Sequence, residues 1–123
     1  MSTSKPPDSS RPAAWHITPM NPAEAPWPLL LLADPSREKV KRYLPGSTCY
    51  AARQTAQFTP SGLGALIGVC VLQPPQPERD SWELMNMAVS PSWQRSGIGS
   101  ALLHHAIGEL RKRGIKQLEV GTG

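Results

Sequence analysis

The stretch that most constrains the fold is SWELMNMAVSPSWQRSGIGSALL, residues 81–103. Residues 82–89 have the composition of a strand, and after Gly97 the apolar residues recur every three or four positions, as in a helix packed on a sheet. The run IKQLEV at 115–120 is strand-like again. A strand, a helix and a strand in this order predict two parallel strands joined by a right-handed crossover.

Prolines and capping residues divide the first half of the chain. The sequence predicts a strand at 15–18 that ends before Pro19, and then a helix at about 27–33. Asn21 is the expected N-cap of the segment that begins with Pro22. A second helix is expected to be capped by Asp34, with Pro35 in its first turn and a stop at Pro45-Gly46.

Strand-favouring residues return at 49–54 and 66–72. The turn residues at 59–64 predict that these two strands pair antiparallel, and 73–80 reads as a loop with no room for a ladder. In the strand 82–89, alternation places two sets of four side chains on opposite faces: Glu83, Met85, Met87 and Val89 on one, and Trp82, Leu84, Asn86 and Ala88 on the other. The sequence thus predicts an α/β (α+β) fold with a mixed, mostly antiparallel sheet flanked by helices.

Length and composition favour one domain. A chain of 123 residues supports a single core, and the Ser- and Pro-rich opening at 1–12 is typical of a disordered lead-in. No apolar run is long enough for a membrane span, and the opening lacks the apolar centre of a signal peptide. We therefore expect a soluble, cytoplasmic protein without a membrane partner.

The candidate metal ligands lack the spacing of a metal site. Cys49 and Cys70 lie in separate apolar strands, which predicts buried free thiols. His104 and His105 are neighbours within the predicted helix, so they point to different sides and are expected to pack or to face solvent. Glu109 and Arg113 are expected to form an i, i+4 pair near the helix end, with Gly114 as the residue that terminates it.

The turn before the helix has the features of an anion site. Gly97 and Gly99 leave backbone N–H groups uncovered at a helix N-terminus, where the aligned peptide dipoles favour phosphate. The alternative is that the glycines only allow close helix–sheet contact. The turn lacks the Lys-Ser/Thr of a nucleotide triphosphate loop and the third glycine of a dinucleotide fingerprint. Gln94 and Arg95 precede the turn, and an arginine there can supply charge to a diphosphate.

These residues resemble the acyl-CoA-binding motif of the GNAT superfamily of N-acyltransferases, Q/R-x-x-G-x-G/A. The motif places the coenzyme A pyrophosphate on Gln94, Arg95, Ser96, Gly97, Ile98, Gly99 and Ser100. The resemblance also implies a bulged preceding strand whose outward amides, at about Met87, Ala88 and Val89, bind the pantetheine arm. It implies acetyl-CoA as cosubstrate, and the transfer of an acetyl group to a primary amine of a small molecule or protein.

The resemblance suggests two catalytic candidates. Glu83 matches the place where related histone acetyltransferases carry a general-base glutamate, whereas a glutamate near a strand start is usually a solvated surface residue. Asn86 is a candidate for orienting the amine, and an inward, hydrogen-bonded asparagine is the alternative. The acceptor itself cannot be read from the sequence.

Residues 13–123 read as a partial N-acetyltransferase domain. Full members of the family continue past this last strand into a further helix and strands that usually supply a tyrosine as general acid. The last strand is therefore expected to be a sheet edge that a second copy can pair with, and the favoured interpretation is a truncated domain.

Two other function classes remain open. One is a non-catalytic acyl-CoA-binding or regulatory module built on the same turn. The other, weaker one is an anion or nucleic-acid binder, because the net charge is +4 and basic residues cluster near the chain's end. Its candidate residues are Arg95, Arg111, Lys112, Arg113 and Lys116.

Overall fold

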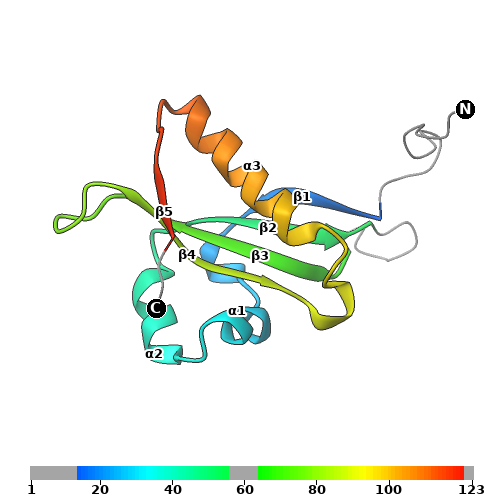
Figure 1. The fold of residues 1–123 in the computed structure, drawn as a ribbon. Coiled ribbons are helices and arrows are strands. Elements are labelled where there is room, and N and C mark those ends of the chain that lie inside the picture. The colour runs from blue at the N-terminus through cyan, green and yellow to red at the C-terminus, as the bar shows by residue number, and fades with distance from the viewer. Residues whose placement is uncertain (1–13, 56–63, 121–123) are drawn as a thin grey trace, which may run out of the picture.

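A five-stranded sheet forms the centre of the protein (Figure 1). The computed structural model describes residues 14–55 and 64–120. The strands follow one another across the sheet in chain order. They are β1 (Trp15–Met20), β2 (Thr48–Gln54), β3 (Leu66–Gln73), β4 (Trp82–Val89) and β5 (Leu118–Val120). The expected lead-in at 1–12 and most of the expected turn at 59–64 lie outside the described residues.

The strand pairing confirms the mixed α/β fold. Each of the first three strands pairs antiparallel with the next, and β5 pairs parallel with β4. The predicted strand–helix–strand unit is therefore present, with α3 (Ile98–Lys112) between β4 and β5. It places the glycine turn at the carboxyl end of β4.

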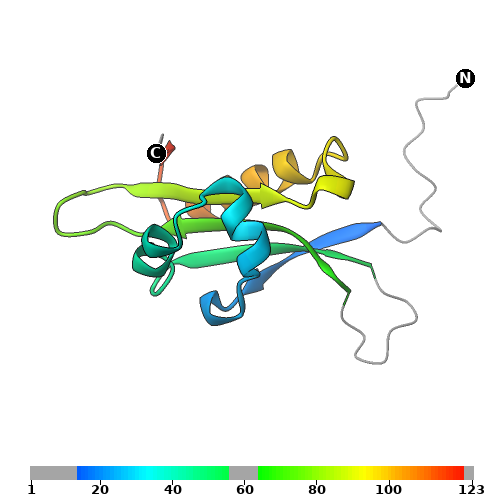
Figure 2. The same ribbon diagram turned by 90° about the horizontal axis from the view of Figure 1, so that it is seen from below.

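Helices cover both faces of the sheet. Figures 1 and 2 show α3 on one face and the short helices α1 (Trp27–Ala33) and α2 (Arg37–Tyr43) on the other. Each face has its own core. The core under α3 is Tyr50, Ala52, Ile67, Cys70, Leu72, Leu84, Ile98, Leu102, Ala106 and Leu110. The core under α1 and α2 is Met20, Ala25, Leu29, Leu30, Val40, Tyr43, Leu44, Cys49, Ala51, Val69, Val71 and Ala88.

The N-terminal elements correct two predictions. β1 continues through Pro19 to Met20; a proline is tolerated there because β1 is an edge strand. Ser36, rather than Asp34, caps α2, and its hydroxyl accepts a hydrogen bond from the Lys39 amide at 3.2 Å. Asn21 does cap the 3₁₀ turn η1 (Pro22–Glu24), as predicted.

A bulge breaks the predicted alternation of β4. Val71 of β3 lies opposite Asn86, whereas the next residue of β3 lies opposite Leu84, so Met85 is the extra residue. Leu84 consequently packs in the core under α3, while Ala88 packs under α1 and α2. The prediction that these side chains share one face is wrong, because a single inserted residue reverses the alternation.

The end of α3 shortens β5 relative to the predicted strand at 115–120. Gly114 has a φ of +80° and follows the helix as predicted. The Ile115 amide then donates to the Leu110 carbonyl at 3.0 Å, so residue 115 completes the helix cap and is not available to the sheet.

The ion pair predicted between Glu109 and Arg113 is replaced by another one. The Glu109 carboxylate is 3.1 Å from Lys112 Nζ. The Arg113 guanidinium lies over the Trp82 ring, 5.4 Å from its centre.

Candidate functional site

The carboxyl half of β4 is an open edge of the sheet. Among residues 14–55 and 64–120, β5 pairs only with Trp82–Leu84, and residues 85–89 pair with β3 alone. In Figure 1, β5 lies at the amino-terminal part of β4, with which it pairs. In the described part of the chain, the outward backbone groups of β4 beyond Leu84 are therefore not paired with another strand.

The register shows which backbone groups face this opening. The Ser90 amide donates to the Ile67 carbonyl at 2.8 Å. Residues of an antiparallel strand face their neighbour alternately, so Ala88 also bonds toward β3, whereas Met87 and Val89 point their amides away from it. The Val89 carbonyl accepts from Gln94 Nε2 at 3.2 Å, on the open side. Of the three strand residues predicted to face the ligand, the alternation thus places Met87 and Val89 at the open edge.

The glycine turn follows directly. After the 3₁₀ turn η2 (Pro91–Trp93), Arg95 and Gly97 adopt positive φ values of 69° and 87°. The first helical bond runs from the Ala101 amide to the Gly97 carbonyl at 3.0 Å. Within the described part of the chain, the amides of residues 95–100 have no acceptor. A row of free N–H groups is therefore present at the amino terminus of α3, where the helix dipole is positive.

Helix packing does not explain the second glycine of this turn. A Cβ on Gly99 would meet only a Val89 methyl, at 3.9 Å, which is an ordinary contact. Close contact between sheet and helix instead depends on Gly68 of β3, where a Cβ would lie 2.9 Å from the Ile98 side chain. Gly97 is explained by its positive φ. Neither packing nor a positive φ therefore explains the glycine at position 99.

The side chains of the turn divide into two groups. Ile98 is buried in the core under α3, so only its amide is available to a ligand. Arg95 and Ser100 are exposed, and the Ser96 hydroxyl donates to the Trp93 carbonyl. The other basic candidates, Arg111, Lys112, Arg113 and Lys116, lie at or beyond the opposite end of α3 and do not join Arg95.

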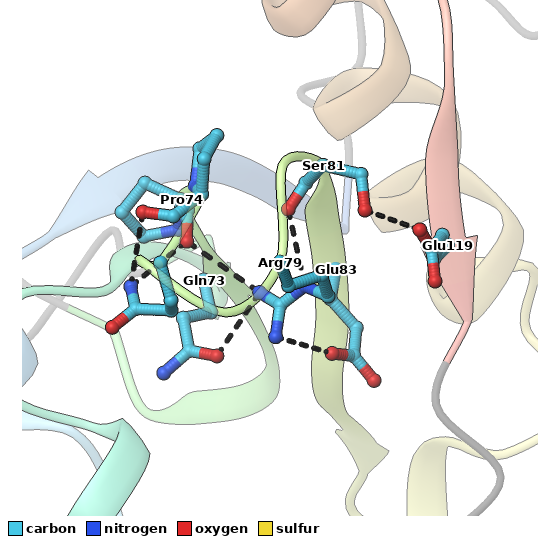
Figure 3. Close-up of polar contacts among 8 residues, drawn as sticks. Gln73, Pro74, Arg79, Ser81, Glu83 and Glu119 are labelled. Atoms are coloured by element: carbon cyan, nitrogen blue, oxygen red, sulfur yellow. Dashed lines mark hydrogen bonds and ion pairs between the residues drawn. The ribbon is translucent and has the colours of Figure 1, made fainter.

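Glu83 lies near the start of β4 and is paired with an arginine that the sequence did not single out. Its carboxylate is 2.9 Å from Arg79 Nη1, and its side chain is 20% exposed. Figure 3 shows Arg79 among neighbours from the β3–β4 loop, where it also donates to the Gln73 side chain at 3.1 Å and to the Ser81 carbonyl at 3.1 Å. A bridge between Gln76 and Arg79 occurs in this segment, which was predicted to contain no strand pairing.

Asn86 is held inside the protein. It is 3% exposed, and its Nδ2 donates to the Leu30 carbonyl at 3.0 Å and to the Tyr43 hydroxyl at 2.9 Å. Its Oδ1 is buried and accepts no hydrogen bond from the described residues. Burial is the main cause of the raised pKa of Tyr43, whose hydroxyl is 3.3 Å from Asp34 Oδ2. This geometry matches the inward, hydrogen-bonded alternative: Asn86 joins β4 to α1 and α2.

A pocket of about 960 Å³ opens beside Glu83 on the face covered by α1 and α2. Its lining joins distant parts of the chain: Ala33, Asp34, Pro35, Lys39, Arg42, Tyr43, Gln73, Glu83, Leu84 and Met85. Leu84 is the last residue of β4 that pairs with β5 in the described chain, so the pocket meets the start of the part of β4 that pairs with β3 alone. The sequence identified Glu83 alone among these as a site residue, because nothing local marks which exposed residues of α2 turn toward β4.

A family profile described as "Acetyltransferase (GNAT) family" matches residues 13–123. The chain belongs to this family. An uncharacterized N-acetyltransferase of Bacillus subtilis, YvbK, is 39% identical over 95 residues, which are 77% of this chain and 55% of that protein. The predicted resemblance is thereby confirmed, and relatives of this GNAT chain are named N-acetyltransferases.

Two solved GNAT structures support the same assignment. The IAA acetyltransferase from Bacillus cereus superposes with a TM-score of 0.72 at 38% identity, over 89% of this chain and 66% of that one. A GNAT family acetyltransferase from Elizabethkingia anophelis, with acetyl-CoA bound, gives 0.70 at 34% identity with the same coverage. This chain therefore spans about half to two-thirds of the length of these relatives. No helix in the described ranges is long and apolar enough to cross a membrane.

Proposed function

We propose that this protein is an N-acetyltransferase that moves an acetyl group from acetyl-CoA to a primary amine of a small molecule or protein. The observation that carries the proposal is the row of unpaired amides at residues 95–100, which continues into the open edge of β4. A relative of the same fold that binds acetyl-CoA supports this choice of cosubstrate. The diphosphate, the pantetheine arm and the thioester of acetyl-CoA would each meet a different part of this surface.

The diphosphate binds at the turn. The free amides from Arg95 to Ser100 donate to its oxygens, the α3 dipole favours its charge, and the exposed Arg95 side chain adds a cation. Gln94, already bonded to the Val89 carbonyl, holds the turn against the end of β4. Gly99 leaves room for the phosphates to approach the backbone.

The pantetheine arm lies along the open half of β4. Its amide groups pair with the outward backbone groups of Met87 and Val89, as an additional strand would. Val89 lies six positions after Glu83, a span of about 20 Å in a strand. The thioester consequently points toward the bulge at Met85 and the neighbouring pocket, where an amine is to be held.

The transfer requires two proton movements. The acceptor nitrogen attacks the thioester carbonyl carbon, a C–N bond forms, and the C–S bond breaks as the thiolate leaves. The amine loses a proton to a base, and the thiolate takes one up. Glu83 is the proposed base, directly or through water. Because Arg79 holds its carboxylate, Arg79 fixes where that carboxylate lies relative to the pocket.

The decisive experiment compares two glycines of α3. Gly99→Ala is expected to weaken acetyl-CoA binding by about tenfold while the helix gains up to about 1 kcal/mol of stability. Gly108→Ala is the matched control, because a Cβ there meets nothing within 4 Å and lies away from the turn; it should leave binding unchanged. Calorimetric titration with acetyl-CoA measures both variants, and equal affinity for Gly99→Ala and the parent would reject the binding site.

Thiol release in the presence of amines separates catalysis from binding. Release of free coenzyme A that depends on an added amine supports the transferase. Tight binding of acetyl-CoA with no amine-dependent release across small amines and peptides supports the non-catalytic acyl-CoA-binding module instead.

A further inference from the structure

The pocket beside Glu83 contains two cations that lack partners. Lys39 and Arg42 both line it, and both are exposed. Neither side chain forms an ion pair or hydrogen bond with any residue in the described ranges. They are three residues apart on α2, so they lie on the same side of the helix, one turn from each other.

The carboxylates of the pocket are already engaged. Asp34 accepts from the Ser36 amide at 3.1 Å and from the Tyr43 hydroxyl at 3.3 Å. Glu83 is paired with Arg79, which lies outside the lining of the pocket. The hydrogen bonds to Asp34 come from neutral groups, so Asp34 keeps its negative charge, but neither Asp34 nor Glu83 forms an ion pair with Lys39 or Arg42 in the described residues.

Other basic residues of α2 are turned elsewhere. The Arg37 guanidinium lies 5.0 Å from the centre of the Trp27 ring. Lys41, between the two pocket cations, is exposed and does not line the pocket. The helix thus presents two of its four basic side chains to the space beside β4. A negatively charged group of a ligand at the α2 side would therefore find two cations that form no ion pair in the described residues.

We propose that the acceptor amine also carries an anionic group, a carboxylate or a phosphate, which Lys39 and Arg42 bind. The anion sits against α2 and the amine lies toward Glu83, at the start of the open edge. This inference rests on the proposed function, since it names the class of amine that the transferase uses. The apolar lining from Ala33, Pro35, Leu84 and Met85 contacts the carbon chain between the two charges.

The test measures binding of matched amines without acetyl-CoA. The probes are β-alanine, γ-aminobutyrate and ε-aminocaproate, each beside its uncharged amide, and phosphoethanolamine beside ethanolamine. Titrations followed by NMR on the full chain are expected to show at least one anionic probe binding about tenfold more tightly than its neutral counterpart. The carboxylate and phosphate series show which anion is preferred.

Variants identify the residues that hold the anion. In the double variant Lys39→Gln/Arg42→Gln, the anionic probe and its neutral counterpart should bind with about equal affinity. Lys41→Gln on the same helix is the control and should keep the preference. Equal binding of every anionic probe and its neutral counterpart, no binding of any probe, or an equal loss in the Lys41→Gln control would each overturn the proposal.

Turnover distinguishes failure of this inference from failure of the proposed function. Anion-dependent binding without amine-dependent thiol release would support the anion-binding role of Lys39 and Arg42 and reject the transferase. Thiol release with neutral and anionic amines alike, unaffected by the double variant, would support the transferase and overturn the inference.

Discussion

The two faces of the sheet are built in different ways. On the face of α3, the strand, the glycine turn and the helix follow one another within residues 82–112, and the site there consists of backbone amides. On the face of α1 and α2, the pocket joins residues 33–43 to residues 73–85, and its chemistry is in side chains. The first site is thus formed by residues close together in the chain, and the second by residues far apart in it.

This difference predicts separate sensitivities. A backbone site depends on turn geometry and on the absence of side chains, so a local substitution damages it directly. A side-chain pocket depends on contacts that hold distant segments together, such as the hydrogen bonds from Asn86 to Leu30 and Tyr43. Substitutions on one face should leave the other face's property largely unchanged.

The largest effect is expected from Asn86→Asp. Near neutral pH this change buries a carboxylate beside the Leu30 carbonyl, and the free energy of unfolding should fall by about 3–5 kcal/mol. Burial raises the pKa of the new carboxyl in the folded state above its value in the unfolded chain. The loss of unfolding free energy relative to the parent should therefore become smaller as the pH falls through that raised pKa.

Urea unfolding at neutral and acidic pH measures this effect. Asn21→Asp is the control, because Asn21 is an exposed N-cap and aspartate caps a helix equally well. A loss in Asn86→Asp that is independent of pH would show that Asn86 is not held in an apolar, hydrogen-bonded position.

On the other face, Gly68→Ala should cost about 1–3 kcal/mol of unfolding free energy. The new methyl would lie 2.9 Å from Ile98 Cγ2 and 3.2 Å from Leu102 Cδ1, so α3 must shift outward from β3. Thermal unfolding should detect the loss. Gly108→Ala, which adds the same methyl in open space, should be neutral or slightly stabilising. Equal stability of these variants would mean that α3 is not packed tightly on β3.

The two cysteines report on the two cores separately. Cys49 lies under α1 and α2, and Cys70 lies under α3. Burial raises the pKa of the Cys49 thiol from 9.0 to about 11 and that of Cys70 to about 12. Both thiol pKa values are higher in the folded protein than in the unfolded chain. The stabilisation from the neutral thiols is therefore complete below pH 9.0, and it is lost as the pH rises toward the folded-state pKa values.

At one pH unit above 9.0, each thiol should account for a loss on the order of 1 kcal/mol. Chemical denaturation of the parent, Cys49→Ala and Cys70→Ala across alkaline pH measures the share of each core. The unfolding free energy of each variant should fall less steeply with rising pH than that of the parent, whatever the variant's stability at neutral pH. Profiles parallel to the parent would show that the thiols ionise freely in the folded protein.

The smallest expected effect on stability is that of Arg79→Ala. Its ion pair with Glu83 is partly exposed, so removing it should change the unfolding free energy by less than about 1 kcal/mol. The pH profile of kcat/KM should shift all the same, because Arg79 positions the proposed base. Arg79→Lys should restore much of the parent profile by returning a cation. An unchanged profile in Arg79→Ala would argue against Glu83 as the base.

Several features near β4 could be predicted from the sequence because they depend on neighbouring residues. The bounds of α1 and the start of α3 follow from local apolar spacing and from Gly97, and the parallel pairing of β4 with β5 follows from the connecting helix. The bulge at Met85 was implied only by the family resemblance, at an approximate position, since no residue type in that strand marks an inserted position.

The candidate site was predictable in the same uneven way. The turn from Gln94 to Ser100 could be identified because its motif is continuous in the sequence. The partnership of Glu83 with Arg79 and the role of Asn86 as a link between layers could not, because each depends on how a loop or helix packs against β4.

By itself, then, the sequence determined the order of strands and helices, the glycine turn and the family. It could do so because backbone conformation and periodic burial are set by residues close together in the chain. Only the tertiary structure decided that Lys39 and Arg42 share a pocket with Glu83 and that β4 has an open half. Side chains from distant segments meet according to packing and register, and a shift of one residue in β4 is enough to change which of them face each other.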